Sequence, residues 1–82
     1  IESYPNPFTN QITLKVNSNT TQEVALTVKN YLGQPIQTIN QQLEIGQNLT
    51  TIHFAENWKA GIFYILIEFE NNESEVLKFI KI

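Results

Sequence analysis

Apolar and polar side chains alternate with a period of two along much of this chain. In residues 11–17, Ile12, Leu14 and Val16 alternate with polar side chains, and residues 23–29 repeat the pattern. Because successive side chains of a strand point to opposite faces of a sheet, each run predicts a strand with one buried face. No segment has a sustained 3.6-residue period, so the pattern does not predict an amphipathic helix.

Four further segments have the composition of strands. Residues 36–45 are rich in Gln and Thr and predict a weaker strand, either at a sheet edge or irregular. Residues 49–54 predict another strand, and residues 75–82 predict the last one. Residues 62–69 are the most hydrophobic run, which is typical of a central strand covered on both faces. Six or seven short strands separated by turns predict an all-β fold, an antiparallel β-sandwich.

Three isolated glycines mark turns between these segments. Gly33 precedes Pro35, Gly46 follows the weaker strand, and Gly61 precedes the most hydrophobic one. A glycine takes positive φ without a Cβ clash, so each is expected to shape a turn. Residues 55–61 are expected to form either a short helical turn or a plain loop.

The chain opens with the aromatic and proline-rich segment Tyr4-Pro5-Asn6-Pro7-Phe8. Each proline disfavours helix in the residue before it and lacks an N–H group. The segment is therefore expected to run extended, and either to lie at a sheet edge or to cross between sheets. Tyr4 and Phe8 are expected to anchor it to the core.

The composition limits what the chain can do. It has 82 residues, which fits one domain over residues 1–82, and no Cys for a disulfide or a metal cluster. The net charge is −3 and no basic cluster is present, which disfavours nucleic-acid binding. No apolar run approaches the length of about 20 residues that a transmembrane segment needs, so none is expected.

Residues able to carry catalysis are scarce. His53 is the one histidine, and it lies inside a predicted strand with no Cys or Asp in the chain to support it. An ordinary strand residue is therefore favoured over a general base or a zinc ligand. Glu68, Glu70, Glu73 and Glu75 crowd around a predicted hairpin tip, where a solvated surface is favoured over a glycosidase carboxylate pair. The sequence predicts no enzyme, no cofactor and no metal site.

The aromatic residues leave two interpretations open. Phe63, Tyr64 and Phe69 lie in the predicted central strand and are expected in the core. Trp58 either plugs the end of the sandwich or offers a platform on which a sugar stacks. On the second interpretation the domain is an accessory carbohydrate-binding or fibronectin-like module of a secreted enzyme or adhesin, with glycans bound through Trp58, Tyr64 or Tyr31. A structural spacer is a third possibility.

The order of these landmarks resembles one known family over the whole chain. The opening segment is followed by two turn motifs, an aromatic motif before the central strand and a final lysine-bearing strand. In order, the motifs are Tyr4-Pro5-Asn6-Pro7-Phe8, Tyr31-Leu32-Gly33-Gln34, Gly46-Gln47-Asn48, Trp58-Lys59-Ala60-Gly61-Ile62-Phe63-Tyr64 and Val76-Leu77-Lys78-Phe79-Ile80-Lys81-Ile82. The series resembles the type A C-terminal sorting domain of type IX secretion cargo in Bacteroidetes. Where this chain has Phe63-Tyr64, the family often has Gly-Ile/Val-Tyr.

That resemblance implies an immunoglobulin-like sandwich that acts as a secretion signal and not as a catalyst. Such a domain directs an N-terminal cargo domain from the periplasm through the outer-membrane translocon, with its cargo-shuttle protein, to the cell surface or the medium. A cell-surface sortase-like protease then typically removes it. The resemblance also implies that Tyr4–Phe8, Gly33, Gly46 and Gly61 are structural, and that the machinery reads Lys78, Phe79, Ile80, Lys81 and Ile82.

The last segment suggests how it is read. Alternation places Val76, Lys78, Ile80 and Ile82 on one face and Leu77, Phe79 and Lys81 on the other. A terminal strand at a sheet edge exposes N–H and C=O groups to which a receptor can add a strand. On this hypothesis, deleting residues 78–82 abolishes export and leaves most of the sandwich folded.

Overall fold

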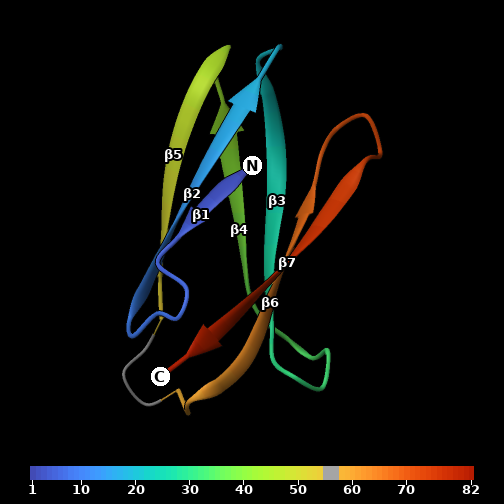
Figure 1. Ribbon diagram of the computed structural model, residues 1–82. Coiled ribbons are helices and arrows are strands. Elements are labelled where there is room, and N and C mark those ends of the chain that lie inside the picture. The colour runs from blue at the N-terminus through green and yellow to red at the C-terminus, as the bar shows by residue number, and fades with distance from the viewer. Residues whose placement is uncertain (55–57) are drawn as a thin grey trace.

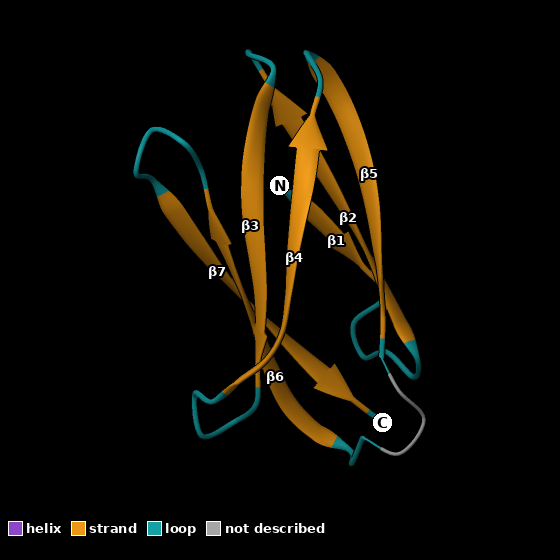
Figure 2. Cartoon of the chain, turned by 180° about the vertical axis from the view of Figure 1, so that it is seen from behind, coloured by secondary structure: helices purple, strands orange, loops and turns teal. Residues whose placement is uncertain are grey.

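The computed structural model describes residues 1–54 and 58–82, and strands dominate this part of the chain (Figures 1 and 2). The described residues form seven strands: β1 (Glu2–Tyr4), β2 (Gln11–Ser18), β3 (Gln22–Lys29), β4 (Pro35–Leu43), β5 (Gly46–His53), β6 (Gly61–Glu68) and β7 (Ser74–Lys81). One sheet has the order β1-β2-β5 and the other the order β4-β3-β6-β7, and every strand pair within them is antiparallel. The predicted antiparallel, immunoglobulin-like sandwich of about seven strands is confirmed.

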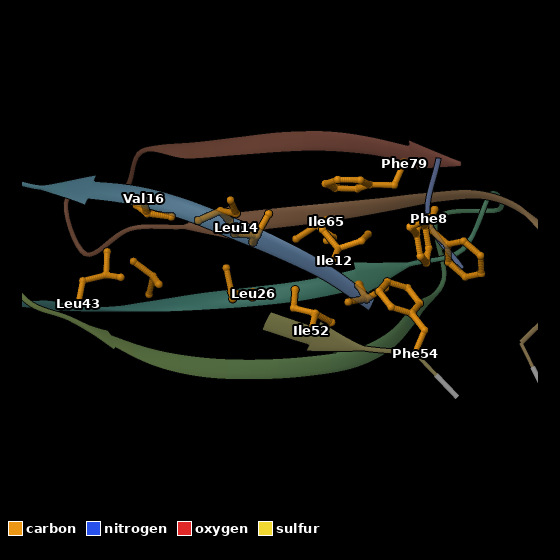
Figure 3. Close-up of a cluster of buried hydrophobic side chains, with 14 residues drawn as sticks. Phe8, Ile12, Leu14, Val16, Leu26, Leu43, Ile52, Phe54, Ile65 and Phe79 are labelled. Atoms are coloured by element: carbon orange, nitrogen blue, oxygen red, sulfur yellow. The ribbon is translucent and has the colours of Figure 1, made fainter. Parts of the chain in front are cut away.

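The two sheets enclose the core that the alternating pattern predicted. Every second residue of β2 and β3 is buried, beginning with Ile12 and Val24. Figure 3 shows that the core differs along its length: aliphatic side chains such as Val16 and Leu43 lie at one end, and Phe8, Phe54 and Phe79 gather at the other. The aromatic end of the core lies beside the end of β7.

Strand β6 is central, as predicted, because it lies between β3 and β7. The expectation that both of its faces are covered is wrong. Phe63, Ile65 and Ile67 are buried between the sheets, whereas Ile62 and Tyr64 lie on the outer face. A two-layer sandwich has no third layer to cover that face, so Tyr64 is only half-buried, and Phe63 is the residue of the pair that enters the core.

The turns follow the glycines. Gly33, Gly46 and Gly61 have φ values of 81°, 104° and 147°. At Gly33 the side chain of Asn30 completes the turn, because its Oδ1 accepts hydrogen bonds from the backbone N–H groups of Leu32 and Gln34, each at 3.0 Å. β4 is an edge strand, as predicted. In the segment expected to be a helical turn or a loop, residues 55–57 lie outside the described residues, and residues 58–60 are not helical.

Candidate functional site

The five residues expected to be recognised by the secretion machinery lie on opposite faces of β7 and at its end. Phe79 and Lys81 point towards the core and are buried, whereas Lys78, Ile80 and the following Ile82 are exposed. The predicted alternation of this strand is confirmed. Of the five residues, three side chains are available to a partner and two belong to the folded interior.

Phe79 belongs to an aromatic cluster that closes one end of the core. It is 1% exposed, and its ring meets that of Phe8 edge-on at a centroid distance of 6.3 Å. Phe8 also packs against Phe54 at 4.6 Å, and Trp58 stacks on Phe63 at 5.8 Å with an interplanar angle of 17°. Trp58 therefore lies over this end of the core, as the plug interpretation expects.

Lys81 lies beside this cluster and is only 9% exposed. Among the described residues no hydrogen bond or ion pair to its ammonium group is formed. A lysine in such a position buries its hydrocarbon stem while its charged end reaches water. Most of the Lys81 side chain therefore packs against the core and is not exposed on the surface of β7.

The opening segment crosses from one sheet to the other. Tyr4 ends β1 in the three-stranded sheet, and four residues later Phe8 forms an isolated parallel bridge with Lys81 in the four-stranded sheet. The predicted crossing is confirmed. The expectation that the segment runs extended is not met throughout, because the chain bends at Asn6 and Pro7. Phe8, 1% exposed, is the expected anchor, but Tyr4, at the end of a short edge strand, is 50% exposed and does not anchor the segment.

Residues 5–8, the crossing segment, seal part of the β7 edge. The Asn6 side chain replaces a neighbouring strand: its Nδ2 donates to the Lys78 carbonyl at 3.3 Å, and its Oδ1 accepts from the Ile80 N–H at 3.0 Å. The Phe8 N–H donates to the Ile80 carbonyl, and the Ile82 N–H donates to the Phe8 carbonyl, each at 2.9 Å. The Asn6 side-chain amide thus supplies both a donor and an acceptor to the edge of β7. The side chains of the neighbouring prolines, Pro5 and Pro7, have neither.

These bonds correct the strand-addition hypothesis. β7 is at a sheet edge, as predicted, but its groups between the Lys78 carbonyl and the Ile82 N–H are already paired. Backbone groups of a strand alternate between its two sides, so Val76 lies on the part of the edge that the crossing segment does not cover. Between the Lys78 carbonyl and the Ile82 N–H, a receptor therefore meets side chains and not a free backbone edge.

The other candidate residues lie where a structural or solvated role was expected. His53 is exposed at the end of β5, opposite Gln11. Glu68, Glu70, Glu73 and Glu75 are exposed around the β6–β7 hairpin. Within residues 1–54 and 58–82 no group of three or more potential ligands that could hold a metal ion is found. In the same residues no helix is long and apolar enough to span a membrane.

The exposed outer face of β6 was not predicted from the sequence. Ile62, Tyr64 and Leu66 stand beside Ile80, Lys78 and Val76 of β7, so the exposed side of the last strand continues onto its neighbour. The sequence feature that indicates this face is the continuous apolar run of residues 62–67, in which the side chains on both faces of the strand are hydrophobic. The same pattern fits a strand with one buried face and one exposed apolar face.

The fold and this site define a small immunoglobulin-like sandwich whose last strand is anchored on one face and presents lysine and isoleucine on the other. The family model described as the secretion system C-terminal sorting domain matches residues 2–82. The chain therefore belongs to this family, the sorting domains of type IX secretion, and membership implies export to the cell surface or secretion. No curated protein matched the chain significantly, and neither did any solved structure.

Proposed function

We propose that this domain is a non-catalytic C-terminal signal that directs an attached cargo protein across the outer membrane through the type IX translocon. The observation that carries the proposal is the family match over residues 2–82, which spans both the opening motif and the last strand. The accessory binding module gains no support from the family match, and the Trp58 ring packs against Phe54 and Phe63 at the aromatic end of the core.

The proposed route begins in the periplasm, where the folded domain is presented by its N-terminal cargo. The translocon and its cargo-shuttle protein recognise it, and a cell-surface sortase-like protease then separates it from the cargo. The cargo ends at the cell surface or in the medium.

Within the site, we assign recognition to the exposed members of the last segment, Lys78, Ile80 and Ile82. Phe79 and Lys81 support recognition indirectly, because their burial fixes which side of β7 faces outwards. This assignment replaces strand addition at residues 78–82 with recognition of side chains.

A transplanted domain tests the proposal. Residues 1–82 fused behind a periplasm-targeted fluorescent reporter in a Bacteroidetes host are expected to carry the reporter to the surface or the medium. The matched controls are the reporter without the domain and the fusion in a host with an inactivated translocon; both are expected to retain fluorescence in the periplasm. Equal export with and without a working translocon contradicts the proposal.

A further inference from the structure

Strand β2 is longer than β1, the short strand that pairs with one of its edges. The register pairs Glu2, at the start of β1, with Lys15, whereas β2 continues to Ser18. Figure 1 shows β2 running on past the N-terminus towards its arrowhead. The last residues of β2 therefore have a neighbouring strand, β5, on one side only.

The backbone of Asn17 faces this open side. The Asn10 carbonyl accepts a hydrogen bond from the Phe54 N–H at 2.8 Å, and these two residues continue the register of the β2–β5 pairs. Because the backbone groups of a strand alternate between its two sides, the even-numbered residues of β2 bond to β5 and the odd-numbered ones face β1. Within residues 1–54 and 58–82, neither the N–H nor the C=O of Asn17 has a hydrogen-bond partner, and its side chain is exposed.

A residue directly before Ile1 fits this open position. The antiparallel register places Ile1 opposite Val16, so the preceding residue lies opposite Asn17. In that position it exchanges both backbone hydrogen bonds with Asn17, the same relation that the register gives Glu2 and Lys15.

A cleft on the same side of the molecule continues this path. It has a volume of about 800 Å³, and it is lined by Ile1, by the end of β2 and by the β6–β7 hairpin. Amides and hydroxyls dominate the lining, among them Asn19, Thr20, Asn71 and Ser74. Such groups bond to the N–H and C=O groups of a peptide whatever its side chains are. The cleft therefore suits an extended polypeptide.

We propose that the open edge of β2 and this cleft hold the polypeptide that leads into the domain from the cargo, as an N-terminal extension of β1. The matching family is described as a C-terminal domain, so a cargo segment precedes it in the parent protein. In naming that segment as the cargo linker, the inference rests on the proposed function. Covalent continuity with Ile1 gives the linker a far higher effective concentration at the edge than a separate peptide or a second copy has.

This pairing shields the junction between domain and cargo. Proteases cut most readily where the chain is exposed and few backbone hydrogen bonds hold it. The residues that pair with Asn17 and Ser18 are held on β2, so the peptide bonds next to Ile1 are protected. Separation of the domain from its cargo is therefore expected upstream of the paired residues.

The experiment compares residues 1–82 with the same domain carrying the natural upstream segment of its parent protein. The amide of Asn17 is expected to exchange its hydrogen about tenfold or more slowly in the longer chain, as measured by ¹H–¹⁵N NMR. The amide of Gln47 is the control, because Gln47 stands opposite Asn17 in the register and its backbone faces the outer edge of β5. Its exchange rate is expected to be the same in both chains.

A pair of proline variants tests the pairing by a second measurement. Asn17→Pro removes the N–H that faces the linker, and Gln47→Pro removes one at the opposite edge of the same sheet. The upstream segment is expected to raise the melting temperature of the wild type and of Gln47→Pro by about 2 °C or more. The rise in Asn17→Pro is expected to be less than about half of that. Comparing the two chain lengths of each variant cancels the cost of the proline itself.

The outcomes separate the inference from the proposed function. Equal exchange of Asn17 in the two chains overturns the inference, and so does a rise in melting temperature that survives Asn17→Pro. Protection of Asn17 in residues 1–82 alone that grows with protein concentration assigns the edge to a second copy and also overturns it. Failure of the fused reporter to be exported defeats the proposed function alone, because pairing at β2 is measured without the secretion machinery.

Discussion

Replacing Phe8 with alanine is expected to lower the free energy of unfolding by about 3–5 kcal/mol, the usual cost of truncating a buried phenylalanine. Phe8 is 1% exposed, and its ring lies within 6.3 Å of the rings of Phe54, Phe63 and Phe79. A domain of this length is stable by only about 4–12 kcal/mol in total. The substitution is thus expected to remove a large part of the stability, measured as the shift of a urea unfolding curve.

Tyr4 provides the matched control, since it belongs to the same opening motif but is half-exposed. Tyr4→Ala is expected to change stability by less than about 1 kcal/mol, as exposed substitutions usually do. Trp58 is the only tryptophan and stacks on Phe63, so its fluorescence reports unfolding at this end of the core. Equal losses at Phe8 and Tyr4 would show that the aromatic cluster does not anchor the opening segment.

Deleting residues 78–82 is expected to unfold the domain, contrary to the hypothesis drawn from the sequence. The deletion removes Phe79 from the aromatic cluster, along with the backbone groups that pair with Asn6 and Phe8. Loss of the Phe79 side chain alone costs about 3–5 kcal/mol, before the lost pairing with β6 is counted. The truncated chain is expected to lose its dispersed amide resonances in a ¹H–¹⁵N correlation spectrum. Export lost on truncation therefore cannot distinguish a missing signal from an unfolded domain.

A triple substitution keeps the fold while changing what the last strand presents. Lys78→Thr, Ile80→Thr and Ile82→Thr together alter exposed positions and retain a residue type that suits strands. This variant is expected to keep a native-like spectrum. A dispersed spectrum from the truncated chain, or a collapsed one from the triple variant, contradicts the division of β7 into an anchored face and a presented face.

The features that the sequence predicted are those that depend on neighbouring residues. Alternation in β2 and β3 identified the buried residues, and the same rule identified which side chains of β7 point inwards. Glycines at 33 and 46 located the turns, because their positive φ is a local requirement. The family resemblance depended on the order of such local motifs, so the family could be recognised without any knowledge of tertiary contacts.

The crossing segment shows why contacts between residues far apart in the sequence were not predictable. Asn6 bonds to residues 72 and 74 positions away, and it does so through a side-chain amide that replaces backbone groups. No periodicity marks such a contact, and the prolines on either side indicate only the absence of helix. The outer face of β6 was misassigned for a related reason: an apolar run does not record how many layers a fold has.

Hydrogen exchange of the β7 backbone tests most directly the claim that the crossing segment seals the last strand and leaves its side chains as the signal. The N–H groups of Ile80 and Ile82 bond to Asn6 Oδ1 and to the Phe8 carbonyl, whereas Val76 lies on the uncovered part of the edge. The account predicts that the amides of Ile80 and Ile82 exchange about a hundredfold or more slowly than that of Val76. Asn6→Ala is expected to release Ile80 first. Ile80 and Ile82 amides that exchange as fast as that of Val76 would contradict the account and restore strand addition at this edge.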